Sequence, residues 1–264
     1  MKGIITPEIY LGSILLEPNR WKPDQAPSIR VSEWSDRAAA AGFAGWELWE
    51  KHYLTAPKSE QLPVRHGAMP VKIFNTYARF DHNGSADRNR AIEALHELPR
   101  LTGMKFNVGN EPTATSGYRA CIQSTRTLLP AATSLLCECH PDTQLETPAM
   151  LADFIDRENH WPFEIIILPF LDGPELIRKW FAVAGRHVTH AHVQMRDPKN
   201  PRVFVGLVDD RPRAKECLAA LVDGGFRGTF TLEFSAPTLT TNDEPEALFR
   251  AARLDFDFLR ENWP

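Results

Sequence analysis

Residues 164–195 read EIIILPFLDGPELIRKWFAVAGRHVTHAHVQM, and this segment sets the architecture of the chain. An apolar run at 164–170 has the length of a buried strand, residues 173–186 carry apolar side chains at helical spacing, and residues 188–195 predict a second strand. A helix that connects two neighbouring strands returns the chain to the same edge of the sheet, so the two strands run parallel. The segment therefore predicts an α/β fold with a parallel sheet.

The same alternation continues on both sides of this segment. Further strands are predicted at 8–16, 45–49, 71–80, 104–109, 134–140 and 228–234, and further helices at 32–43, 88–103, 117–133, 148–159, 213–226 and 244–262. About eight strands alternating with helices over roughly 250 residues predict a closed (β/α)8 TIM barrel. No segment is rich enough in proline, glycine and serine to form a linker, so residues 1–264 are predicted to form a single domain. The long segments 17–30 and 50–70 are predicted to be loops that cover the mouth of the barrel.

The composition limits the kind of partner that this chain binds. The 264 residues include 43% hydrophobic and 24% charged residues, and the net charge of −4 and a pI near 6.1 leave no basic surface for nucleic acid. The first 21 residues lack the features of a signal peptide and no apolar run has the length of a membrane span, which predicts a cytoplasmic protein with no membrane partner. The four cysteines have no CxxC spacing, so Cys121, Cys137, Cys139 and Cys217 are predicted to be reduced structural thiols.

Polar residues stand where several predicted strands end. In SLLCECH, residues 134–140, Glu138 and His140 share one strand face, and Pro141 follows at once. In a TIM barrel the carboxyl ends of the strands face the active site, so Glu138 is expected to meet His190 or His192 of the seventh strand and Glu233 of the eighth. Two carboxylates and an imidazole suit a divalent metal such as Mn, Mg, Co or Zn. Without a metal, such close carboxylates repel each other, and one takes up a proton.

Four segments carry a resemblance to a known family. AGFAGWEL at 41–48, the Glu138-x-His140 strand end, HAHVQMRD at 190–197 and above all GGFRGTFTLEF at 224–234 resemble the xylose-isomerase-like TIM-barrel superfamily of sugar phosphate isomerases and epimerases. The resemblance extends from about residue 9 to the last helix, in the same order. It implies Glu138, His192 and Glu233 as metal ligands, with Glu138 and Glu233 also serving as the catalytic acid/base pair. The implied activity is isomerisation or epimerisation of a sugar or related polyhydroxy carbonyl compound through an enediolate.

The sixth strand departs from the pattern of the family. That strand usually ends in Asp-x-x-His, whereas Pro169 and Asp172 stand at those positions here. The fourth metal ligand is therefore missing or displaced, and two alternatives stay open. One is a metal-dependent dehydratase or lyase, similar to inosose or dehydroshikimate dehydratases or cleaving a keto-glycoside, and the other is a non-catalytic barrel that has lost its metal. Asp172 is either a displaced ligand or, with Glu175, the capping box of the next helix.

Three further residues are candidates for binding a carbohydrate-like small molecule. His140 contacts substrate or caps the turn at Pro141, and Gln194 lies on the strand face of His192 and is expected to donate to a substrate oxygen. Glu47 either braces the barrel interior or accepts from a sugar hydroxyl. Each metal ligand also has a plain structural alternative, because a buried glutamate can pair with arginine and His192 can be a hydrogen-bonded core histidine. The sequence leaves the oligomeric state open, a homo-oligomer included.

Overall fold

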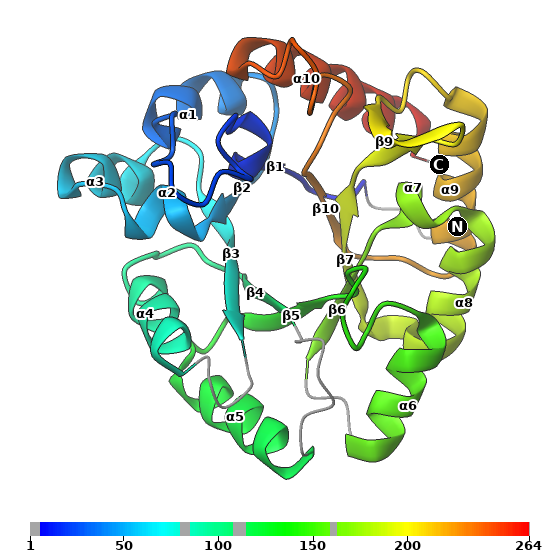
Figure 1. Ribbon diagram of the computed structural model, residues 1–264, viewed down its shortest axis with the longest axis horizontal. Coiled ribbons are helices and arrows are strands. Elements are labelled where there is room, and N and C mark those ends of the chain that lie inside the picture. The colour runs from blue at the N-terminus through cyan, green and yellow to red at the C-terminus, as the bar shows by residue number, and fades with distance from the viewer. Residues whose placement is uncertain (1–5, 80–84, 108–114, 159–162, 264) are drawn as a thin grey trace.

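The computed structural model describes residues 6–79, 85–107, 115–158 and 163–263. Within them, parallel strands close a barrel in the order β1-β10-β7-β6-β5-β4-β3-β2, with helices around the outside (Figure 1). The predicted (β/α)8 TIM barrel is confirmed. The strands of the barrel are β1 (Ile9–Gly12), β2 (Gly45–Trp49), β3 (Val71–Arg79), β4 (Gly103–Asn107), β5 (Ser134–Glu138), β6 (Glu164–Ile167), β7 (Val188–Val193) and β10 (Thr229–Leu232).

The helices lie between the strands in the chain, as the alternation predicts. They are α1 (Val31–Ala40), α2 (Glu50–Leu54), α3 (Lys58–His66), α4 (Ser85–Leu95), α5 (Thr115–Leu128), α6 (Pro148–Glu158), α7 (Pro169–Asp172), α8 (Pro174–Ala184), α9 (Arg211–Asp223) and α10 (Pro245–Asn262). The start of α6 shows how the sequence fixes a boundary, because the Met150 amide donates to Thr147 Oγ1 at 3.2 Å and Pro148 takes the first helical position. None of the described helices has the length and apolar character of a membrane-spanning segment.

The core has two parts, one outside and one inside the barrel. The larger part packs helices against the outer faces of the strands, and it includes buried aromatic residues such as Trp180, Phe226 and Phe230. The smaller part is an apolar plug inside the barrel, made of Tyr10, Ile73, Leu136 and Ile166. Leu136 precedes Glu138 by two residues on β5, so both point to the interior and Glu138 lies one layer nearer to the carboxyl ends. The plug therefore supports a polar layer above it.

Several predicted strands are shorter than the sequence indicated. The first strand ends at Gly12, and residues Ser13–Leu16 form a 3₁₀ helix instead of continuing the strand. The sixth ends at Ile167, because Pro169 has no amide for strand pairing and opens α7. The seventh ends at Val193, and an unpredicted hairpin of β8 (Met195–Asp197) and β9 (Asn200–Val205) follows. Residues 80, 108 and 109 of the third and fourth predicted strands lie outside the described residues.

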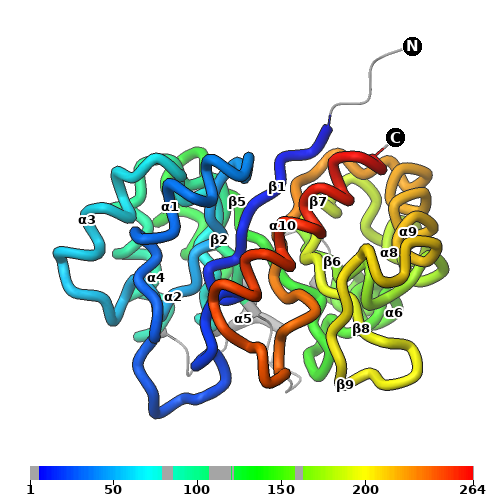
Figure 2. Tube along the Cα trace, turned by 90° about the horizontal axis from the view of Figure 1, so that it is seen from above, coloured from blue at the N-terminus to red at the C-terminus, as the bar shows by residue number. Residues whose placement is uncertain are grey.

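The carboxyl ends of the strands open into the mouth of the barrel. Segment 17–30, the β8–β9 hairpin and the segment before α10 extend at this end, opposite to the start of β1 and the end of α10 (Figure 2). The other predicted covering loop, 50–70, instead contains α2 and α3. Arg20 ties the first of these segments to the last, since its guanidinium lies 2.8 to 3.0 Å from the Asp243 carboxylate and also donates to the carbonyls of Ile14 and Leu15.

The cysteines lie in the core. Cys137, Cys139 and Cys217 are buried and form no disulfide, as predicted, and burial raises the pKa of Cys217 to about 11. The side chain of Cys121 lies outside the described part of the structure. Burial also raises the pKa of Cys139, and a buried thiol with a raised pKa is a poor nucleophile and a poor metal ligand, so Cys139 and Cys217 contribute packing.

Candidate metal centre

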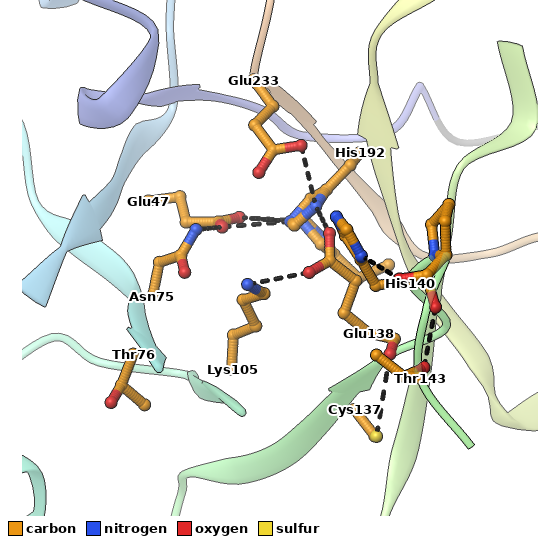
Figure 3. Close-up of polar contacts among 12 residues, drawn as sticks. Glu47, Asn75, Thr76, Lys105, Cys137, Glu138, His140, Thr143, His192 and Glu233 are labelled. Carbon is orange, nitrogen blue, oxygen red and sulfur yellow. Dashed lines mark hydrogen bonds and ion pairs between the residues drawn. The ribbon is translucent and has the colours of Figure 1, made fainter. Parts of the chain in front are cut away.

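Glu138, His192 and Glu233 converge at the mouth of the barrel (Figure 3). Glu138 ends β5, His192 lies near the end of β7, and Glu233 directly follows β10. His192 Nδ1 lies 2.7 Å from Glu138 Oε1 and 3.3 Å from Glu233 Oε2. All three side chains are buried, because the strand ends bring them to one point above the apolar plug. The structure thus gathers the three residues that the sequence analysis assigned as metal ligands.

The chemistry of these donors fits a divalent cation. One ligand atom from each of the three residues lies within 4.8 Å of the others, and two carboxylate oxygens with an imidazole nitrogen suit Mg²⁺, Mn²⁺, Co²⁺ or Zn²⁺. Two of these residues also have partners outside the group of three. The Glu47 carboxylate lies 3.0 Å from His192 Nε2, and Gln194 Nε2 donates to Glu233 Oε2 at 3.0 Å. Such outer partners fix the orientation of the ligands of a metal and tune its affinity.

His192 stands between carboxylates on both sides of its ring. Burial alone lowers the pKa of the imidazole, but Glu233, Glu47 and Glu138 together outweigh burial and raise the pKa well above the ordinary value. The histidines in turn outweigh burial at Glu47 and hold the pKa of that carboxyl well below its usual range. Without a metal, the ring is therefore a cation that donates from Nδ1 to Glu138 and from Nε2 to Glu47.

Lys105 joins this centre, and the sequence analysis missed it. The lysine lies on β4, its side chain is 3% exposed, and its Nζ is 2.8 Å from Glu138 Oε2. Burial lowers the pKa of the ammonium, but Glu138 and other neighbours outweigh burial and raise it, so Lys105 carries a positive charge. The available signal is the order Met104, Lys105, Phe106, where one charged residue interrupts an otherwise apolar buried strand.

A polar layer with Glu47 at its centre supports the three candidate ligands. Asn75 Nδ2 donates to Glu47 Oε1 at 2.7 Å, and His190 Nε2 lies 3.2 Å from Glu47 Oε2. Ligand atoms of Glu47, His190 and His192 also lie within 4.8 Å of one another, but Asn75 already donates to one Glu47 oxygen and the two imidazoles contact the other. This geometry supports the bracing interpretation of Glu47, and a contact with a sugar hydroxyl stays a prediction.

Two polar atoms beside this layer are buried without a hydrogen-bond partner among the described residues. They are the Oδ1 atom of Asn75 and the indole Nε1 of Trp49; Trp49 ends β2, and Asn75 pairs with it from the middle of β3. Buried polar groups are nearly always satisfied, by water or ligand where protein atoms are missing. An acceptor and a donor of this kind are thus available to a bound hydroxyl compound.

His140 and Asp172 lie apart from the three ligands. His140 is exposed, with Nδ1 2.6 Å from the carbonyl oxygen of Pro141, which matches the turn-capping interpretation and leaves substrate contact a prediction. Asp172 accepts from the indole of Trp180 at 2.7 Å, and burial raises its pKa to about 6. The predicted capping box is wrong, because Gly173 is the N-cap of α8 and no side chain caps the helix. Asp172 lies at the end of α7 and bonds to Trp180 of α8. Among the described residues, it does not belong to either group of side chains close enough together to hold a metal ion.

Comparison with known proteins establishes the fold. No family model and no curated protein matches the sequence. Solved structures match along nearly the whole chain. They include 3-keto-D-glucoside 4-epimerase YcjR from E. coli (16% identity, 97% of this chain and 99% of that one, TM-score 0.60) and the probable 3-DHS dehydratase AsbF from Bacillus anthracis (12%, 96% and 98%, 0.67). A xylose isomerase-like TIM barrel protein from Mycobacterium smegmatis in complex with magnesium also matches (14%, 100% of both chains, 0.58). The chain has the xylose isomerase-like TIM-barrel fold, as the resemblance implied.

Proposed function

We propose that this protein is a divalent-metal-dependent isomerase or epimerase of a sugar or related polyhydroxy carbonyl compound. The observation that carries the proposal is the convergence of Glu138, His192 and Glu233 within 4.8 Å at the mouth of the barrel. The shared fold with a keto-glucoside epimerase and with a magnesium-bound barrel supports it. The binding of a carbohydrate-like substrate is part of the same proposal.

The residues divide the chemistry between them. Glu138, His192 and Glu233 would hold a divalent cation, which would supply Lewis-acid polarisation of a substrate carbonyl and its neighbouring hydroxyl and so acidify the hydrogen on the hydroxyl-bearing carbon. Glu138 and Glu233 flank His192 from two different strands, so two carboxylates are available at this point. We assign one of them to remove the proton from carbon and the other to return a proton, which completes an isomerisation or an epimerisation.

The neighbouring groups hold these carboxylates in place. Gln194 donates to Glu233 and leaves the other oxygen of that carboxylate available to the reacting carbon. Glu47 holds the His192 ring from the side opposite to Glu138. Water is largely excluded, because the Glu138 and Glu233 side chains are 2% and 7% exposed, and exclusion of water strengthens electrostatic interactions with developing charge.

A dehydratase or lyase reaction is the second candidate. The observation that favours it is the end of β6, where Leu168 and Pro169 replace an acidic ligand and leave fewer protein oxygens around the centre. After removal of the same proton, expulsion of a substituent from the next carbon gives elimination instead of proton return. The fold is also shared with a probable 3-DHS dehydratase.

Solvent isotope exchange distinguishes the two reactions and tests the proposal. The purified protein, reconstituted with Mn²⁺, is incubated in D₂O with D-tagatose, D-fructose, a 3-keto-D-glucoside and 3-dehydroshikimate, and products are followed by NMR. An isomerase or epimerase incorporates deuterium beside the carbonyl of a rearranged sugar, whereas a dehydratase forms an unsaturated product with loss of water. If no compound exchanges a carbon-bound proton or reacts, this function is not supported and the non-catalytic barrel takes its place.

A further inference from the structure

Lys105 places a fixed positive charge inside the candidate metal centre. It belongs to β4, next to the strand that carries Glu138, and its Nζ lies 2.8 Å from Glu138 Oε2. In the close-up, Lys105 points toward Glu138 from the side of Asn75 (Figure 3). The two side chains are 3% and 2% exposed, so water screens their interaction poorly.

The charges around the centre are poorly matched to a divalent ion. The two candidate carboxylate ligands, Glu138 and Glu233, contribute two negative charges, and Lys105 offsets one of them; the third carboxylate, Glu47, lies on the far side of His192 and is not in this ligand group. The end of β6 does not restore the balance, because Leu168 and Pro169 are buried residues without charge. Divalent-cation sites gain affinity with the number of charged ligands. The ammonium therefore opposes the cation twice, by repulsion and by occupying a carboxylate oxygen of Glu138.

We infer that Lys105 competes with the divalent cation for Glu138 and thereby sets the metal affinity of this centre. The inference rests on the metal site of the proposed function. Lys105 acts as a resident cation: it stabilises the buried carboxylate while no metal is bound, and metal binding weakens the Lys105–Glu138 ion pair. The site consequently binds its metal more weakly than the same three ligands bind it without the lysine.

A second lysine–glutamate pair offers a matched control on the surface. Lys179 Nζ lies 2.8 Å from Glu175 Oε1 on α8, the same separation as in the Lys105–Glu138 pair. The side chains of the surface pair are 60% and 82% exposed, so water and salt screen their charges. Replacing Lys179 removes an equal charge at an equal separation from a glutamate, away from the candidate ligands.

The experiment measures Mn²⁺ affinity and does not require a substrate. The wild type and the variants Lys105→Met, Lys105→Arg and Lys179→Met are stripped of metal and titrated with MnCl₂ by calorimetry at one pH. We expect Lys105→Met to bind Mn²⁺ at least roughly tenfold more tightly than the wild type, since a nearby like charge is gone. Lys105→Arg keeps the charge and should bind like the wild type, as should Lys179→Met.

Thermal unfolding with and without Mn²⁺ covers the case in which a variant is unstable. Removing the ammonium leaves Glu138 buried without that partner, so Lys105→Met and Lys105→Gln should lose stability in chelator and regain it in Mn²⁺. A variant that folds only when Mn²⁺ is added supports the competition. If both variants stay unfolded in saturating Mn²⁺, the cation cannot replace the ammonium and the inference is wrong. It is also wrong if folded Lys105→Met binds Mn²⁺ no more tightly than the wild type.

The outcome for Lys105 is separate from the outcome for the proposed function. A protein that converts none of the tested compounds, yet gains Mn²⁺ affinity in Lys105→Met, contradicts the enzyme and supports the competition. A wild type that epimerises a sugar with Mn²⁺, while Lys105→Met has unchanged affinity, supports the enzyme and contradicts the competition.

Discussion

Two buried histidine clusters stand at the mouth of the barrel, and they differ in their balance of charge. The His192 cluster contains His192, Glu47, Glu138 and Glu233. The His52 cluster contains His52, Glu17 and Ser13, with His52 Nδ1 2.9 Å from Ser13 Oγ and Nε2 3.0 Å from Glu17 Oε2. Both histidines are buried, at 0% and 4% exposure. The same residue types at similar distances thus occur twice at one end of the molecule.

In the His52 cluster, hydrogen bonds within the cluster and from neighbouring backbone amides stabilise the single carboxylate, Glu17. Glu17 accepts hydrogen bonds from the amides of Asn19, Ser28 and Ile29 and from the Ser28 hydroxyl as well as facing His52. Burial opposes ionisation of Glu17, but hydrogen bonds from His52 and Ser28 outweigh it and lower its pKa to about 2. Burial is the largest influence on His52 and lowers its pKa.

The His192 cluster instead has more carboxylates than cations, even when Lys105 beside Glu138 is counted with the imidazole. Three glutamates surround one imidazole, and their charge raises the pKa of His192 against the effect of burial. Perturbed groups of this kind gather at functional sites, whereas a cluster with one carboxylate and complete hydrogen bonding is typical of structural support. The comparison teaches that the surplus of charge, and not the pairing of histidine with glutamate, marks the candidate active site.

The largest expected difference between the clusters lies in turnover. Glu233→Gln removes a candidate proton carrier and a candidate metal ligand, so turnover of a converted sugar should fall by roughly a hundredfold or more. Glu17→Gln should retain turnover within roughly tenfold in the folded protein, because Glu17 supports the mouth and does not touch the reacting carbon. Steady-state kinetics with circular dichroism as the check on folding measures both. A folded Glu17→Gln variant without activity would place the His52 cluster in the chemistry.

The second difference concerns bound metal. After reconstitution with Mn²⁺ and desalting, elemental analysis should find close to one ion per chain in the wild type and far less in His192→Gln, which loses a ligand. His52→Gln should keep its metal, because neither metal group among the described residues includes His52. Equal metal loss in the two variants would remove the distinction between the clusters.

The third difference concerns stability. Glu17→Gln weakens several buried hydrogen bonds to a charged acceptor, so the free energy of unfolding should fall by about 2 to 3 kcal/mol. Urea denaturation measures the change. Glu175→Gln on the surface of α8 serves as the control, with an expected change within about 0.5 kcal/mol. A loss in Glu17→Gln no larger than in the control would show that the cluster does not stabilise the fold.

The smallest expected effect is the pH dependence that the His52 cluster contributes. The pKa of Glu17 is about 2 in the folded chain, below its ordinary value, so its contribution is present above about pH 4 and is lost as pH falls toward 2. His52 also has a lowered pKa in the folded chain, so its neutral form is favoured there and stability falls as pH drops below about 6.5. The free energy of unfolding of the wild type minus that of His52→Gln, measured between pH 8 and 5, should shrink as pH falls. A difference that grows over that range would reverse the assignment.

The sequence predicts that Glu138, His192 and Glu233 lie close together because a parallel barrel brings strand ends together, and their roles stay a prediction. A glutamate or histidine that points inward near the carboxyl end of a strand faces the mouth, and Glu138, His192 and Glu233 all stand at or next to such ends. The contact of Lys105 with Glu138 could not be predicted in the same way, because it depends on how far the lysine side chain reaches along the neighbouring strand. The backbone partner of Lys105 is Leu136, two residues before Glu138, so the sequence order alone does not show the contact.

The His52 cluster was missed for a different reason. Alternating apolar residues predicted one strand through residue 16, but the chain turns into a 3₁₀ helix at Ser13, which directs the serine and Glu17 toward α2. The hydroxyl of Ser13 also accepts from the amide of Trp49, at the end of β2. These are contacts between two βα connections, and a local pattern carries no information about them. The contact between Asp172 and Trp180 could not be predicted for the same reason, because it depends on how α7 packs against α8.

Closure of the barrel has a consequence for the order in which the protein matures. The first strand pairs with β10, and Arg20 bonds to Asp243, 223 positions later in the chain. A contact this distant in sequence forms late, because the intervening chain must be ordered before the two ends meet. On the ribosome, Glu233 emerges after nearly the whole barrel has been synthesised. The candidate metal centre therefore assembles late in folding, and a chain synthesised only to β7 has Glu138 and His192 but not Glu233.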